Sequence, residues 1–72
     1  MDEVVLNVGP AAEGWGLDCD LPLEPTYFVS VEFAEQTARA LALRLTDAGR
    51  DVRLFVRDRL DRTVAVHRYF SL

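Results

Sequence analysis

One stretch in the middle of the chain has the spacing of an amphipathic helix. Small and apolar residues recur there every three or four positions along one stripe, at Ala34, Ala38, Leu41, Leu45 and Ala48. Ser30 precedes the stripe as a candidate N-cap, and Gly49 follows it as a candidate C-terminal cap. A strand over residues 27–33 is a competing interpretation of the start. The pattern predicts one helix from Ser30 to Ala48, so the rest of the fold must come from the flanking segments.

The flanking segments alternate in hydrophobicity, as strands do. Residues 4–8 form a β-branched run that Gly9 and Pro10 should stop, and residues 15–19 alternate between large apolar and small or polar side chains. Pro22 and Pro25 bracket a loop, after which residues 27–29 can be extended. Residues 52–57 and 64–67 alternate again, with a turn at 58–62.

Two β-hairpins around one helix are therefore expected. If the loop of the second hairpin has two or four residues, three cross-strand pairs are expected: Arg57 with Val64, Phe55 with Val66, and Arg53 with Arg68. The predicted fold is a single α+β domain over residues 1–72, of order strand-strand-helix-strand-strand (ββαββ). The helix should pack on one face of an antiparallel sheet.

This order, with Gly14-Trp15 at a strand start, a Phe28-x-Ser30 helix cap, an alanine-rich helix and a terminal hairpin, resembles a family of small bacterial ββαββ domains of unknown function. The resemblance covers most of the chain and implies a fold. It implies no activity, because no catalytic residues carry over. That family commonly has an Asp-Gly turn in its last hairpin, and the chain departs from the pattern there with Asp61-Arg62.

The chain is too short for more than one core. At 72 residues such a core supplies only about 3–5 kcal/mol of net stability. Cys19 is the only cysteine and His67 the only histidine, so neither an intramolecular disulfide nor a structural zinc site is expected. With a disulfide and a metal site excluded, self-association is the remaining source of additional stability. The short core therefore predicts a homodimer.

The N-terminus and the apolar runs bear on location. The chain starts Met1-Asp2-Glu3, the reverse of the basic start of a secretory signal, and no apolar run approaches the length of a membrane span. We expect a complete, cytoplasmic protein. All eight basic residues are arginine, which together with the many alanines suggests a GC-rich, bacterial coding sequence.

Charge is divided sharply along the sequence. Residues 1–36 hold eight acidic and no basic side chains, whereas residues 37–72 hold eight arginines and four aspartates, so the halves carry −8 and +4 and sum to −4. Such halves can meet within the fold, in a second copy or on a charged partner. The candidate binding residues cluster in the terminal hairpin: Arg53, Arg57, Arg59, Arg62, Arg68, Phe55 and Tyr69.

Apolar residues outside the expected core suggest an interface. They lie off the helical stripe or on the second face of the last hairpin: Phe33, Leu43, Val64, Val66 and Phe70. The leading prediction is a non-enzymatic protein-interaction module that self-associates through these residues and the hairpin arginines. One alternative is a nucleic-acid-binding protein that uses Arg53, Arg57 and Arg68, although a pI near 4.7 opposes it. Another is an acidic inhibitor that presents Asp18, Asp20 and Glu24 to a basic site.

No catalytic, phosphate-binding or metal-binding motif is present, and no cofactor is expected. A Cys19–His67 pair could in principle support nucleophilic catalysis, but Cys19 shares a strand face with Trp15 and Leu17 and is better explained as a core residue. Asp18 and Asp20 supply only two ligands for a cation and fit a solvated strand face better.

Overall fold

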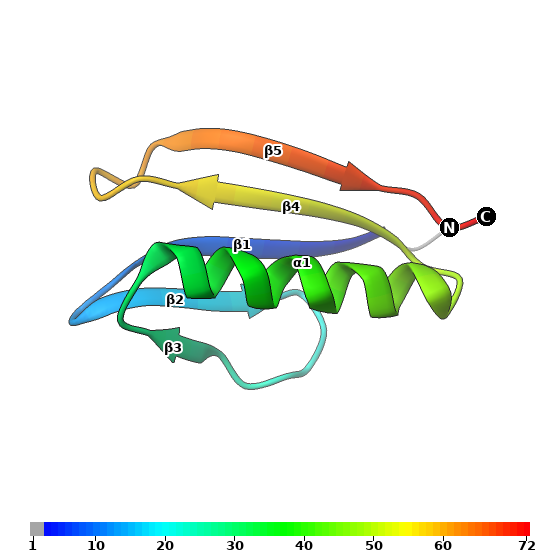
Figure 1. The fold of residues 1–72 in the computed structure, drawn as a ribbon, viewed down its shortest axis with the longest axis horizontal. Helices are drawn as coiled ribbons and strands as arrows, with labels where there is room; N and C mark the ends of the chain where they lie inside the picture. The colour runs from blue at the N-terminus through cyan, green and yellow to red at the C-terminus, as the bar shows by residue number, and fades with distance from the viewer. Residues whose placement is uncertain (1–2) are drawn as a thin grey trace.

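One helix lies across a five-stranded sheet in the computed structural model, which describes residues 3–72 (Figure 1). The elements in chain order are β1 (Glu3–Ala11), β2 (Gly14–Cys19), β3 (Thr26–Phe28), α1 (Val31–Asp47), β4 (Asp51–Arg57) and β5 (Thr63–Tyr69). The strands are arranged in the order β3-β2-β1-β4-β5. The predicted α+β class and both hairpins are confirmed, and β3 is a fifth strand.

Helix α1 begins and ends where its caps predict. The Ser30 hydroxyl accepts a hydrogen bond from the Phe33 backbone N–H at 3.2 Å, which satisfies one of the free amides of the first turn. At the other end Gly49 has a φ of 87°, a conformation that glycine adopts without strain. Three alanines on the inner side of the helix, Ala34, Ala38 and Ala42, are fully buried. Ala48, expected on the same stripe, is exposed at the C-cap.

The sheet is mixed, so the prediction of an antiparallel sheet was wrong. The central strands β1 and β4 run parallel, with Val4, Leu6 and Val8 beside Val52, Leu54 and Val56. The short strand β3 explains this direction. Because β3 is antiparallel to β2, it runs in the same direction as β1. Helix α1 then runs the opposite way and returns the chain to the end of the sheet at which β1 starts. Strand β4 consequently starts parallel to β1.

Strand β1 continues through Gly9 and Pro10 to Ala11, so the predicted stop at these residues was wrong. Pro10 lies opposite Trp15 in the β1–β2 hairpin. The pairing of β1 with β4 extends only to Val8, so Pro10 has a neighbouring strand on one side only. A proline is tolerated in such an edge position because it breaks no ladder hydrogen bond on the open side.

The core lies between α1 and one face of the sheet. Its largest fully buried side chains come from the two parallel strands: Leu6, Leu54, Val4, Val8 and Val52. Trp15 and Leu17 extend this core across β2, and no polar or charged residue among 3–72 is buried. Within the same residues, no helix combines the length and the apolar character needed to cross a membrane.

Candidate interaction surface

The sheet face turned away from α1 carries no second layer within residues 3–72 (Figure 1). Since β1 and β4 alternate between buried residues facing α1 and less buried residues facing away, the registers identify the residues of this surface. We call it the open face, and it includes Val5, Asn7, Gly9, Gly16, Asp18, Tyr27, Arg53, Phe55, Arg57, Thr63, Val66 and Arg68.

The β4–β5 hairpin forms the part of the open face that sequence reasoning anticipated. Phe55 lies opposite Val66 and Arg53 opposite Arg68, both as predicted. Arg57 pairs with Thr63 and not with Val64, because an irregularity next to Val56 and Arg57 shifts the register by one residue.

Exposed apolar side chains gather along β5 and just after it. Val66 is 48% exposed, and Val64 and Phe70 are more exposed still, at 61% and 65%. Their neighbour Phe55, on β4, is only partly exposed. Three exposed apolar side chains thus lie within seven residues of sequence at the β5 edge of the sheet, while the β3 edge carries Tyr27 and Val29, which are 70% and 86% exposed.

Most of the hairpin arginines already have partners. Arg53 forms an ion pair with Glu3 across the parallel strands, with Nη2 and Oε1 2.9 Å apart. Arg62 forms one with Asp58 at 3.0 Å, and Arg57 Nε approaches Asp61 at 3.4 Å without hydrogen-bond geometry.

The other two arginines of the set differ from these three. The Arg59 guanidinium lies over the Trp15 ring, 4.9 Å from its centroid. Arg68, between Val66 and Phe70, has no ion pair within residues 3–72. Arg68 is thus the arginine of this set that has neither an ion pair nor an aromatic ring as partner within residues 3–72.

The remaining predicted residues lie elsewhere. Tyr69 pairs with Val52 and packs against the core on the α1 side of the sheet, so it does not share a surface with the arginines. Phe33 and Leu43 are exposed on α1, 61% and 57% respectively, in the opposite layer from the open face. The residues predicted for one interface thus occupy two separate surfaces.

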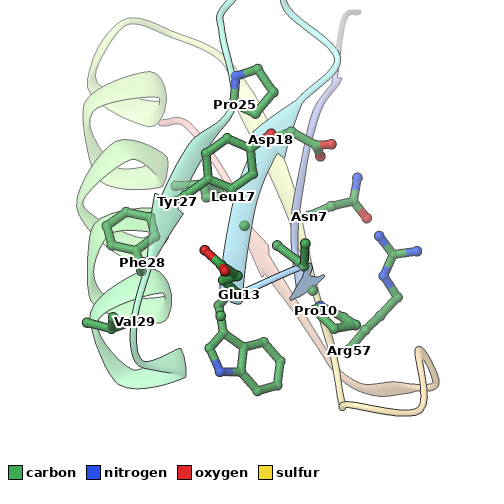
Figure 2. Close-up of a pocket in the computed structure, with 16 residues that line it drawn as sticks. Asn7, Pro10, Glu13, Leu17, Asp18, Pro25, Tyr27, Phe28, Val29 and Arg57 are labelled. Carbon is green, nitrogen blue, oxygen red and sulfur yellow. The ribbon is translucent and has the colours of Figure 1, made fainter.

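A shallow groove crosses the open face where Gly9 of β1 pairs with Gly16 of β2 (Figure 2). The Tyr27 ring lies against Gly16, 3.6 Å from where a Cβ would be, and the Arg57 side chain lies against Gly9, with Nε 3.2 Å from the equivalent point. Figure 2 shows these two side chains on opposite sides of the groove, with Asn7 and Asp18 toward one end. Sequence reasoning missed this feature because Gly9 was expected to end a strand; Gly16, inside a predicted strand, was the one signal of a close approach to the backbone.

The Cys19–His67 pair does not form. Both side chains face α1 in one row across the sheet, but Leu6 and Leu54 stand between them. Three strand spacings amount to about 14 Å, well beyond the hydrogen-bond reach that a nucleophile and its base require. Asp18 and Asp20 are also separate, because the Asp20 carboxylate accepts the Val5 backbone N–H at 3.0 Å. No metal-binding cluster of three or more side chains was found in residues 3–72.

The β4–β5 turn is held by one carboxylate. Asp58 accepts hydrogen bonds from the Leu60 and Arg62 backbone N–H groups at 2.9 and 3.0 Å, and from Arg62 Nε at 3.1 Å. The Arg62 backbone hydrogen bond is the main cause that lowers the pKa of Asp58 below its ordinary value. Asp61, in the same turn, has a φ of 62°, so the turn uses a left-handed residue without a glycine.

Comparisons of the chain with protein-family models, with curated proteins and with solved structures gave no match. The features that bear on function are therefore those of the surface itself. They are an uncovered sheet face, a groove with two glycines at its floor, and an apolar strand at the edge of the sheet.

Proposed function

We propose that this protein is a non-enzymatic interaction module that self-associates through the exposed surface of its β4–β5 hairpin. The observation that supports this best is the cluster of solvent-exposed apolar side chains on and next to β5: Val64, Val66 and Phe70. Exposed apolar patches of this kind mark interaction sites in soluble proteins. A small one-helix domain also gains stability when such a surface is covered.

The chemistry around the patch suits a protein partner. Arg68 lies between Val66 and Phe70 and has no carboxylate partner within residues 3–72. Arginine and aromatic residues are enriched at the centres of protein interfaces, where the planar guanidinium is desolvated at lower cost than an ammonium. The other arginines of the hairpin are held by carboxylates or by Trp15, so they favour a defined surface over a broad anion-binding one.

The outer surface of α1 is a weaker candidate. Phe33 and Leu43 are ten positions apart in the helix, which separates them by about 15 Å along its axis. Isolated apolar residues of this kind are normal on protein surfaces. Leu43 therefore provides a matched control for Val66, since both are exposed aliphatic residues in regular secondary structure.

Light scattering over a series of protein concentrations tests the proposal. The wild-type mass should rise from 8.1 kDa toward about twice that value as concentration increases. Val66→Arg should remain a folded monomer over the same range, because the substitution places a positive charge in the apolar contact next to Arg68. Leu43→Arg should associate as the wild type does. A wild-type protein that stays monomeric at every concentration would contradict the proposal, and so would equal loss of association in both variants.

A further inference from the structure

Strand β5 is the long free edge of the sheet. Strand order leaves two edges, β3 and β5, and they differ strongly in length. β3 has three residues and follows a loop that contains Pro22 and Pro25, whereas β5 has seven residues and no proline. Proteins usually protect edge strands by shortness, proline, lysine or inward charges. β3 is protected in this way, but β5 has only a bulge at its start and the single charge of Arg68.

The free hydrogen-bonding groups of β5 can be assigned from the turn. The Asp58 backbone N–H donates to the Arg62 carbonyl, so Asp58 points its backbone groups toward β5. The register shift puts its extra residue in β5, and burial alternates without a break along β4. Backbone direction therefore alternates from Asp58 back to Leu54, which points the same way, and its partner His67 points back toward β4. The alternate β5 residues, Val66 and Arg68, therefore point their backbone N–H and C=O groups away from β4, toward the solvent at the edge of the sheet.

We infer that β5 pairs antiparallel with β5 of a second copy of this chain, around a two-fold axis perpendicular to the sheet. The pairing joins two five-stranded sheets into one sheet of ten strands. This inference rests on the self-association proposed above and specifies its geometry: the contact is made by backbone hydrogen bonds at the edge, with the apolar patch beside them.

Closure identifies a second copy as the occupant of the edge. When β5 pairs with itself, the only edges left on the assembly are the two β3 strands, which are too short and too close to proline to add further copies. If β5 instead paired with β3 of another copy, each assembly would still have a free β5 at one end. Further copies could then add without limit. Self-pairing is thus the arrangement that uses the exposed edge and then stops.

The side chains of β5 permit this pairing. In a two-fold antiparallel arrangement, residues of the same sheet face lie opposite one another. A register centred on Val66 places Arg68 opposite Val64 of the partner copy, and one centred on His67 places it opposite Val66. Neither sets two arginines face to face. In both registers the exposed apolar residues of the two copies form one continuous surface.

The size of the contact predicts its strength. Seven residues span about 24 Å of edge, and a single pair of strands buries less surface than a stable, standard-sized interface. The dimer should therefore dissociate on dilution. This is why the experiment needs a concentration series.

Amide hydrogen exchange, measured by NMR on the wild-type protein, tests the pairing residue by residue. The Val66 and Arg68 amides should exchange freely in dilute protein and become at least about ten-fold more protected at concentrations where light scattering shows a dimer. The His67 amide, which faces β4 in either state, is the internal control and should be protected throughout. A dimer in which Val66 and Arg68 exchange at monomer rates would overturn edge pairing but leave self-association intact. A monomer at every concentration would overturn both.

A pair of substitutions at one position provides a second test. Arg68→Pro removes an outward N–H without removing a ladder hydrogen bond to β4, and it should abolish the dimer. Arg68→Ala keeps the N–H and should still dimerise. Loss of the dimer in Arg68→Ala as well would assign the contact to the arginine side chain and contradict the backbone pairing. Because the exchange experiment uses the wild type, the inference remains testable even if Arg68→Pro fails to fold.

Discussion

Substitution of Gly14 by alanine should strongly destabilise the protein. Gly14 is buried at the start of β2 with a φ of 145°, and a Cβ at this position would lie 2.3 Å from the Phe28 carbonyl oxygen of β3. The backbone conformation costs a non-glycine residue about 1–3 kcal/mol, and the displacement of β3 should add a similar amount. A total of about 3–4 kcal/mol is comparable to the whole net stability expected at this size.

The matched control is Gly16→Ala, two residues along the same strand. A Cβ at Gly16 would make ordinary contacts, 3.6 Å from the Tyr27 ring and 3.9 Å from the Ala11 Cβ. Alanine should stabilise this position by about 0.5–1 kcal/mol, because it loses less conformational entropy on folding than glycine does.

Thermal unfolding followed by circular dichroism measures both effects. For 72 residues the unfolding entropy is about 0.15 kcal/mol/K. Gly14→Ala should then lower Tm by roughly 20–27 °C, and Gly16→Ala should raise it by roughly 3–7 °C. The melting curves should be recorded at concentrations where the chain is monomeric, because association would make Tm depend on concentration. If Gly14→Ala melted within about 5 °C of the wild type, the tight packing of β3 against β2 would be refuted.

Two further predictions concern the helix cap and the hairpin turn. Ser30→Ala removes the acceptor for the Phe33 amide and should lower the free energy of unfolding by about 1 kcal/mol in urea titrations, whereas Ser30→Asp keeps an acceptor and should not. The pKa of Asp58 is lowered in the folded state, so the stability that this carboxylate contributes is present above its unfolded value of about 3.8 and is lost as pH falls below it. An NMR titration in which Asp58 protonates at or above pH 3.8 would contradict this, and Asp58→Asn should remove that part of the acid sensitivity.

Local patterns in the sequence predicted much of the local structure, although not the continuation of β1 through Gly9 and Pro10 or the pairing of Arg57 with Thr63. The Ser30 cap and Gly49 define α1 because the interactions that begin and end a helix lie within a few residues of its ends. The pairing of Phe55 with Val66 and of Arg53 with Arg68 follows from alternation and turn length within one hairpin. The exposure of the apolar residues on β5 follows from the same alternation, since a sheet with a helix on one side has a second face.

Features that depend on distant parts of the chain were not predictable in this way. β3 is three residues long and too short for a periodic signal, yet it determines that β1 and β4 are parallel. The Arg53–Glu3 ion pair depends on that parallel pairing. It is the only ion pair within residues 3–72 that joins the acidic and basic halves of the sequence, since the other two are local to the β4–β5 turn. The separation of Phe33 and Leu43 from the open face likewise depends on which side of the sheet α1 covers.

Gly14 determines which strand forms the edge of the sheet opposite β5. Gly14 leaves room for the Phe28 carbonyl oxygen, which a Cβ would meet at 2.3 Å, and β3 covers the edge of the six-residue strand β2. If Gly14→Ala displaces β3, β2 becomes a second long edge that carries Trp15 and Leu17 next to its unpaired backbone. A dimer paired through β5 would then expose the β2 edge of each of its two copies, and further copies could add there. At concentrations where the wild type stops at a dimer, and at a temperature where circular dichroism shows that the variant is folded, Gly14→Ala should therefore scatter as species larger than two chains. Ser30→Ala, which destabilises the chain without touching β3, should not.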